Sequence, residues 1–207
     1  MKILAISLLI LGIISTPIPP RKPGYLFGNE TASSKIDVFF DPHCPDSKDF
    51  YSILKEVASG KINDKKVLDN LEIRVHYQAL PFHRNSFLAI KVLKFLQLSK
   101  DFTKYIPGFL EKSFSKIDFY TRGTTRNSKL EVQKFLRDDL ISVVGKDFPE
   151  FNKIFADTNI EIETRLEFKH GASRGVGGAP FLFVNDVLYE DVPENKNDLI
   201  KLLSQYI

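Results

Sequence analysis

The sequence predicts an α/β domain with a strand–helix–strand unit first, then a block of helices, and a strand hairpin with a last helix at the end. The apolar run 36–40 stops at a proline-containing turn, and a helical pattern follows over 46–58. Apolar residues then recur at helical spacing from 85 to 169, and strand character returns only at 181–184. Apolar residues that recur every three or four positions indicate a helix, whereas short apolar or alternating runs indicate a strand.

The first unit begins with a strand at 36–40, where β-branched and aromatic residues are dense. Pro45 stands where the first turn of a helix begins, a position that tolerates its missing N–H group. The helix is expected over 46–58, and 71–77 alternates like a second strand. Because a helix crosses over between them, we expect the two strands to be parallel.

The middle of the chain predicts helices at 85–97, 101–115, 128–143, 147–156 and 158–169. In the first of these, the apolar stripe leaves Lys91 and Lys94 on the side expected to face solvent. The strands 181–184 and 187–189 follow, joined by Asn185-Asp186, an acceptable hairpin turn. An apolar-faced helix over 198–206 ends the domain.

Composition sets limits on partners and on covalent chemistry. The chain has 207 residues, a net charge of +3 and one cysteine, Cys44. Because the charge is small and interleaved, neither nucleic acid nor an anionic membrane surface is indicated as a partner. One cysteine cannot form an internal disulfide, so any disulfide of this monothiol chain is with another molecule.

The N-terminus is typical of a secretory signal peptide. Lys2 precedes a largely apolar run over 3–14, and a proline-rich break follows. The run is shorter than the about 20 residues that a membrane span needs, so we expect no stable membrane insertion; an uncleaved signal anchor is the alternative. We therefore expect a signal peptide at 1–16, a linker at 17–27 and one domain at 28–207, in the secretory pathway or outside the cell.

Two further features bear on location. Asn29-Glu30-Thr31 is an acceptor triplet for N-glycosylation, which makes Asn29 a candidate glycosylation site. The C-terminus does not carry a retention signal for the endoplasmic reticulum. Both observations fit a secreted glycoprotein.

Cys44 lies where a helix N-terminus is expected, a place at which unsatisfied N–H groups stabilise a thiolate. Asp41 and Asp46 work against that effect, whereas His43 helps when it is protonated. On balance we expect a moderately activated thiol. The alternative is a buried, inert cysteine.

Three stretches together resemble the DsbA-like branch of the thioredoxin superfamily. The first runs from Gly28-Asn29 through Ala32 to Ile36-Asp37-Val38-Phe39-Phe40-Asp41 and Cys44-Pro45. The second is Leu80-Pro81-Phe82-His83-Arg84-Asn85-Ser86, and the third is the loop Gly175-Val176-Gly177-Gly178-Ala179-Pro180-Phe181-Leu182-Phe183-Val184-Asn185. The resemblance covers almost all of 26–207. It implies a thioredoxin-like fold (βαβ, helical insertion, ββα) of the DsbA-like type, with the insertion at about 84–172.

The resemblance also implies a cis peptide bond between Ala179 and Pro180, beside the cysteine. A cis proline leaves the backbone of the preceding residue free to pair with an extended client polypeptide. We expect Cys44, Ser47 and Pro180 to carry the chemistry. The residues expected to contact the client are Ala179, His43 and Pro45.

The sequence departs from the family at Ser47, which stands where a resolving cysteine is expected. Without that thiol, mixed disulfides with a client or with glutathione are the chemistry that remains. One alternative is a redox-inactive peptide-binding or chaperone module. Another is an enzyme that resembles the kappa-class glutathione transferases, which share the fold and use a serine site.

Other chemistries have little support. The histidines have no metal-ligand spacing with Cys44, so neither a metal nor another cofactor is expected. A cysteine-protease arrangement would need a distant base such as His170. His83 lies in a matched segment and is expected near the active-site surface or in a structural role.

Overall fold

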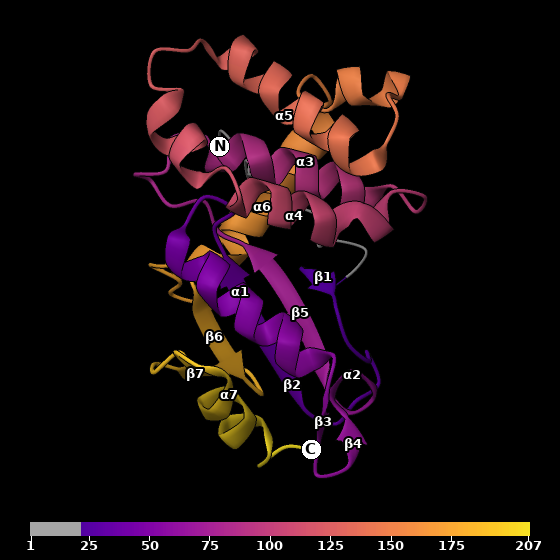
Figure 1. Ribbon diagram of the computed structural model, residues 1–207, viewed down its shortest axis with the longest axis vertical. Coiled ribbons are helices and arrows are strands. Elements are labelled where there is room, and N and C mark those ends of the chain that lie inside the picture. Colours follow the sequence, from indigo (N-terminus) through magenta and orange to yellow (C-terminus); the bar gives the residue numbers. More distant parts are fainter. Residues whose placement is uncertain (1–21) are drawn as a thin grey trace, which may run out of the picture.

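A computed structural model describes residues 22–207 and shows a five-stranded mixed sheet with helices packed on both faces (Figure 1). The strand order is β1-β5-β2-β6-β7. The central strands β2 and β5 are parallel, as the crossover predicted, and the other pairs are antiparallel. The strands are β1 (Tyr25–Leu26), β2 (Lys35–Phe40), β5 (Glu72–Tyr77), β6 (Phe181–Val184) and β7 (Val187–Tyr189).

Residues 22–207 also contain seven α-helices and three segments of 3-10 or π-helix. A small hairpin, β3 (Lys61–Ile62) with β4 (Lys65–Lys66), lies outside the sheet. The α-helices are α1 (Pro45–Ala58), α2 (Val67–Asn70), α3 (Ser86–Leu98), α4 (Ile106–Phe114), α5 (Lys129–Val144), α6 (Thr158–Ser173) and α7 (Lys196–Leu203). The turns are η1 (Thr103–Tyr105), the π-helix η2 (Phe119–Gly123) and η3 (Pro149–Lys153).

Alternating residues of β2 send their side chains to opposite faces of the sheet. Phe40 packs on Phe50 and Tyr51 of α1, whereas the preceding residue, Phe39, packs on His170 of α6. In Figure 1, α1 crosses the near face of the sheet, and the helices of the insertion gather at one end of it. The active-site turn between β2 and α1 lies at that end.

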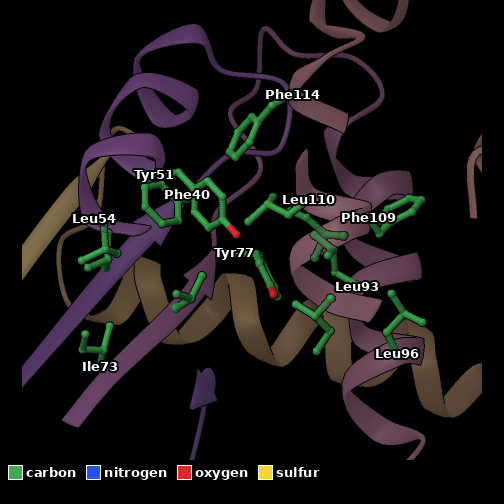
Figure 2. Packing of buried hydrophobic residues seen from close by; sticks show 14 of the residues in the cluster. Phe40, Tyr51, Leu54, Ile73, Tyr77, Leu93, Leu96, Phe109, Leu110 and Phe114 are labelled. Atoms are coloured by element: carbon green, nitrogen blue, oxygen red, sulfur yellow. The ribbon is translucent and has the colours of Figure 1, made fainter. Parts of the chain in front are cut away.

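The helical insertion shares one core with the sheet. Phe40 and Leu54 belong to the same buried cluster as Leu93 and Phe109 of the insertion, and Figure 2 shows Tyr77 lying between the two groups. The insertion therefore forms a single packed unit with the βαβ part. Its position next to the active-site turn is fixed by that packing.

Several expectations are corrected by the structure. Tyr25–Leu26 lie in the expected linker yet form β1, paired with β5. The helix expected at 101–115 is interrupted: η1 ends at Tyr105 and α4 begins at Ile106, with Pro107, which has no N–H donor, in its first turn. The segment expected as a helix at 147–156 forms only the short turn η3. The signal peptide expected at 1–16 lies outside the described residues.

Lys91 and Lys94 are buried, although the apolar stripe of α3 placed them toward solvent. The reason is α6, which packs on that side of α3 and supplies counter-charges. Lys94 Nζ lies 2.8 Å from Glu167 Oε2, and Lys91 Nζ lies 2.9 Å from Glu161 Oε2. Within residues 22–207, none of the helices combines the length and apolarity that a membrane span requires.

Candidate active site

Cys44 is the N-cap residue of α1. Its backbone is extended, with φ of −93° and ψ of 126°, and its carbonyl accepts the first helical hydrogen bond from Lys48 at 3.1 Å. A bond from the Cys44 N–H to the Asp41 carbonyl, also 3.1 Å, closes the turn between β2 and the helix. Pro45 fits the first helical turn because its missing N–H would have had no partner there.

The cis bond expected between Ala179 and Pro180 is present. The pairing of Phe39 with Phe181 brings the loop before β6 beside the end of β2. Cys44 Sγ lies 3.2 Å from the Ala179 carbonyl oxygen, to which the thiol donates. Ala179 and Pro180 are half-buried and Pro45 is exposed, whereas Cys44 is only 3% exposed.

The Cys44 thiol is less acidic than the sequence predicted. Burial raises its pKa, and the negative charge of Asp46 acts in the same direction, against hydrogen bonds from the backbone and side chain of Ser47 and the backbone of Asp46. The thiol's own bond to the Ala179 carbonyl also favours the protonated form. The expectation of a moderately activated thiol was wrong because burial outweighs the helix N-terminus.

Ser47 is fully buried beneath the thiol. Its hydroxyl oxygen accepts the backbone N–H of Asp41 at 3.2 Å, and its hydroxyl and N–H favour a thiolate on Cys44. Ser47 therefore contacts both the turn and the sulfur. It is not the helix cap, because that position belongs to Cys44.

Asp41 has no exposed surface and binds three separate segments. Its Oδ1 accepts the His43 N–H at 2.7 Å and the Ser86 hydroxyl at 2.6 Å, and its Oδ2 accepts the Leu80 N–H at 2.7 Å. His83 Nδ1 lies 3.1 Å from Oδ2, a close charge contact when the ring is protonated but not an aligned hydrogen bond. Sequence reasoning treated Asp41 only as a charge near the thiol.

His43 is turned inward, so its ring does not reach the surface at which a client contact was expected. The ring stacks on Tyr120 with centroids 4.7 Å apart, and its Nδ1 lies 3.3 Å from Ser86 Oγ. Burial, and secondarily the neighbouring His83, lowers the pKa of His43 to about 3. At neutral pH the ring is uncharged and does not stabilise a thiolate as a cation.

A pocket of about 690 Å³ borders the turn on the side of the insertion. Pro45 and Lys48 of α1 line it, together with residues of the insertion between Phe114 and Arg122. Across residues 22–207, no cluster of three or more histidine, cysteine or acidic side chains is arranged to hold a metal ion. Asn29, the candidate glycosylation site, donates its side-chain amide to the Asp69 carbonyl at 2.8 Å.

A second group of titratable residues, mostly buried, lies on the sheet, and no sequence motif indicated it. It consists of Asp37, His76, Lys94, Glu167 and Arg174, here called the His76 network. His76 contacts Asp37 Oδ1 at 3.2 Å through Nε2 and Glu167 Oε1 at 3.0 Å through Nδ1. Arg174 Nη1 lies 2.7 Å from Asp37 Oδ2, and Lys94 Nζ lies 2.8 Å from Glu167 Oε2, so each carboxylate also has a permanent cation as a partner.

Solved structures match this one over most of its length. Oxidised BdbD from Bacillus subtilis has a TM-score of 0.64 at 16% identity, covering 88% of this chain and 92% of that one. DsbA from Chlamydia trachomatis has a TM-score of 0.62 at 15% identity, covering 92% and 96%. The chain has a DsbA-like thioredoxin fold. The thiol-disulfide exchange protein alpha-DsbA2 from Wolbachia pipientis matches with a TM-score of 0.56 at 23% identity, covering 88% and 86%.

No protein-family model and no curated protein sequence matches the chain. At these identities the structural matches establish the DsbA-like fold and leave the chemistry to the residues of this chain. Those residues are one cysteine at the helix start, a serine three positions later and a cis proline beside the sulfur.

Proposed function

We propose that this chain is a monothiol thiol–disulfide exchange protein in which Cys44 forms reversible mixed disulfides with an extended polypeptide client or with glutathione. One observation carries the proposal: Cys44 Sγ lies 3.2 Å from the carbonyl oxygen of Ala179, the residue before the cis proline. That distance puts the nucleophile beside a backbone edge that a client strand can pair with. The DsbA-like fold supports the same chemistry.

The exchange needs only the thiol and a disulfide of the client. The Cys44 thiolate attacks one client sulfur and forms a new S–S bond; the other client sulfur leaves as a thiolate and takes up a proton. Hydrogen bonds from Ser47 stabilise the Cys44 thiolate before attack and again when it leaves. A thiol from a second molecule must break the mixed disulfide, since the chain has no other cysteine.

The test is mass spectrometry of the native protein after incubation with oxidised glutathione, and separately with a disulfide-linked peptide pair. We expect an adduct on Cys44 that dithiothreitol removes and that Cys44→Ser abolishes. The same incubation in urea shows whether the thiol is chemically intact. An adduct that forms only in urea would contradict exchange by the folded protein.

A second function, a redox-inactive peptide-binding module, is favoured by the 3% exposure of Cys44 and by the raised pKa of its thiol. In that case Cys44→Ala would bind extended peptides as well as the wild type does. Ser47→Cys tests the scaffold itself, because it restores a Cys-x-x-Cys pair. Oxidase activity in that variant alone would show that the scaffold supports disulfide chemistry and that the wild type lacks only the second thiol.

The location is proposed from the N-terminal sequence: cleavage of a signal peptide near residue 16 and delivery to the secretory pathway. N-terminal sequencing of the mature protein tests the cleavage. A mass shift on glycosidase treatment that Asn29→Gln removes tests the glycan. An N-terminus that begins at Met1 would contradict the cleaved signal.

A further inference from the structure

The sheet ends at β7, and the outer edge of this strand is open. β7 is last in the strand order, and within residues 22–207 its only neighbouring strand is β6 (Figure 1). A two-residue turn joins β6 to β7, so the first pair, Val184 with Val187, exchanges both hydrogen bonds. The next pair, Phe183 with Leu188, exchanges none. The N–H and C=O groups of Leu188 therefore point away from β6, toward the open edge.

The side chains along this edge are apolar and exposed. Val187 is 70% exposed and Leu188 is 40% exposed. An open strand edge is a template for pairing with another chain, and many proteins block such an edge with lysine or proline. The three residues of β7 include neither. The edge is therefore able to accept a further strand.

The surface beyond the end of β7 is acidic, although the chain as a whole has a net charge of +3. A cavity of about 520 Å³ is lined by the segment that follows β7 and by α7. Its charged lining residues are four carboxylates and one lysine: Glu190, Asp191, Glu194, Asp198 and Lys201. Within residues 22–207, none of these four carboxylates forms an ion pair. The cavity therefore favours a cationic occupant.

The size of the edge bears on which partner fits it. A pairing limited to two three-residue strands falls short of the about 1,000 Å² that a stable interface between two proteins needs. A second copy of this chain is therefore a poor match. A flexible peptide segment can follow the edge and also fill the acidic cavity next to it.

We propose that β7 and the acidic cavity form a docking surface for an extended, basic polypeptide segment. Apolar residues of the segment pair with Val187–Tyr189, and its lysine or arginine side chains enter the cavity. Antiparallel pairing lets one residue of the segment bond both the N–H and the C=O of Leu188, so the basic residues precede the apolar ones. The surface does not involve Cys44, so this binding holds or fails independently of the exchange activity proposed above.

The probe is a short blocked peptide in which lysines are followed by alternating valine and threonine residues. It is titrated into the full chain at low salt, and amide shifts in NMR spectra map the contact and give the affinity. One control peptide has glutamates in place of the lysines. A second control has N-methyl groups along the apolar half, which keep its charge and side chains but remove the donors for strand pairing.

Two kinds of protein variant test the two parts of the surface. Leu188→Pro removes the outward N–H and keeps the pairing with β6, which does not use that group; Leu188→Val, which keeps the N–H, is its control. Glu190→Gln combined with Asp191→Asn removes two charges of the cavity. Its control is Asp101→Asn combined with Glu150→Gln, which removes two exposed charges elsewhere.

We expect the lysine peptide to shift the Leu188 amide signal and to bind about fivefold more weakly when the two cavity charges are removed. Leu188→Pro should abolish binding, whereas Leu188→Val and the control charge variant should bind as the wild type does. Circular dichroism checks that Leu188→Pro is folded, and the N-methylated peptide tests the same hydrogen bonds on the unaltered chain.

Three results would overturn the proposal. The first is that the lysine peptide leaves the Leu188 signal unchanged. The second is that the glutamate peptide or the N-methylated peptide binds as well as the lysine peptide. The third is a dimer in sedimentation experiments that Leu188→Pro dissociates, because the edge would then be occupied by a second copy of the chain.

Discussion

The thiol site and the His76 network are both buried against the same sheet, yet they hold their titratable groups in opposite states. In the His76 network each carboxylate has a cationic partner within 2.8 Å. In the thiol site, Asp41 accepts hydrogen bonds from two backbone N–H groups and a hydroxyl, while Cys44 and His43 stay neutral. Burial alone therefore does not set the charge; the partners do.

The two histidines make the contrast plain. His43 meets a hydroxyl and an aromatic ring, and burial lowers its pKa to about 3. Burial also acts to lower the pKa of His76, but the carboxylates of Asp37 and Glu167 outweigh it and raise that pKa overall. The same two carboxylates have pKa values well below their usual range, because burial is outweighed by His76, Arg174 and Lys94.

The largest expected effect comes from breaking the His76 network. Glu167→Gln leaves Lys94 and His76 without their shared counter-charge, and removal of one partner of a buried pair costs roughly 3–5 kcal/mol. Urea unfolding should show this loss. The matched control is Glu56→Gln, in the exposed Lys196–Glu56 pair, which should cost at most about 1 kcal/mol. Similar losses in both variants would contradict the contrast between buried and exposed pairs.

The pH dependence of stability should separate the two histidines by sign. His43 has a lowered pKa in the folded state, so the stability that comes from its neutral form is present above pH 6.5 and is lost as the pH falls. Between pH 6.5 and 4.5 the wild type should lose roughly 2.3 kcal/mol relative to His43→Gln, since one pH unit corresponds to about 1.36 kcal/mol and the unfolded ring is already half protonated at pH 6.5.

His76 should behave in the opposite way. Its pKa is raised in the folded state, so its contribution is full below pH 6.5 and is lost as the pH rises through the folded value. The advantage of the wild type over His76→Gln should therefore shrink above pH 6.5. Urea unfolding at each pH measures both differences. If the stability of the wild type relative to each variant changed with pH in the same direction, the assignment of charges to the two histidines would be wrong.

Much of the fold could be predicted from local patterns. The parallel pairing of β2 with β5 follows from the crossover helix, and the hairpin turn at Asn185 and Asp186 is present with φ of +48° and +67°. Both are properties of short stretches of sequence. The cis bond at Pro180 was expected only through resemblance to a family, because most X–Pro bonds are trans.

The predictions that failed concern residues whose contacts are distant in the sequence. Lys94 is buried because Glu167 lies 73 residues later, and no helical pattern in α3 contains that information. Asp41 could be read from the sequence only as a charge near the thiol, since its donor Leu80 is 39 residues away. The acidity of Cys44 was misjudged for the same reason: its burial comes from packing between distant segments.

Within the thiol site, Ser47 should matter more than any other single donor. Ser47→Ala removes the hydroxyl that favours the Cys44 thiolate, and a hydrogen bond to a charged group is worth about 1.5 kcal/mol. Alkylation at pH 7 should therefore be about tenfold slower. Ser52→Ala, on an exposed turn of α1, is the control, because its hydroxyl bonds only to the Lys48 carbonyl. An unchanged rate in Ser47→Ala would show that the backbone donors alone set the thiol pKa.

The smallest expected effect tests whether an exposed charge can influence the thiol as the buried partners do. Asp46 is exposed in the first turn of α1, and its charge contributes to the raised pKa of Cys44. Asp46→Asn should speed alkylation at pH 7 by about two- to threefold, a difference that 0.5 M salt should largely remove because exposed charges are screened. Asp49→Asn, also exposed on α1, should leave the rate unchanged. If the effect of Asp46→Asn persisted in high salt, the Asp46 charge would act on Cys44 as a buried partner does. The protonation state of the thiol would then be set by its protein partners and not by solvent.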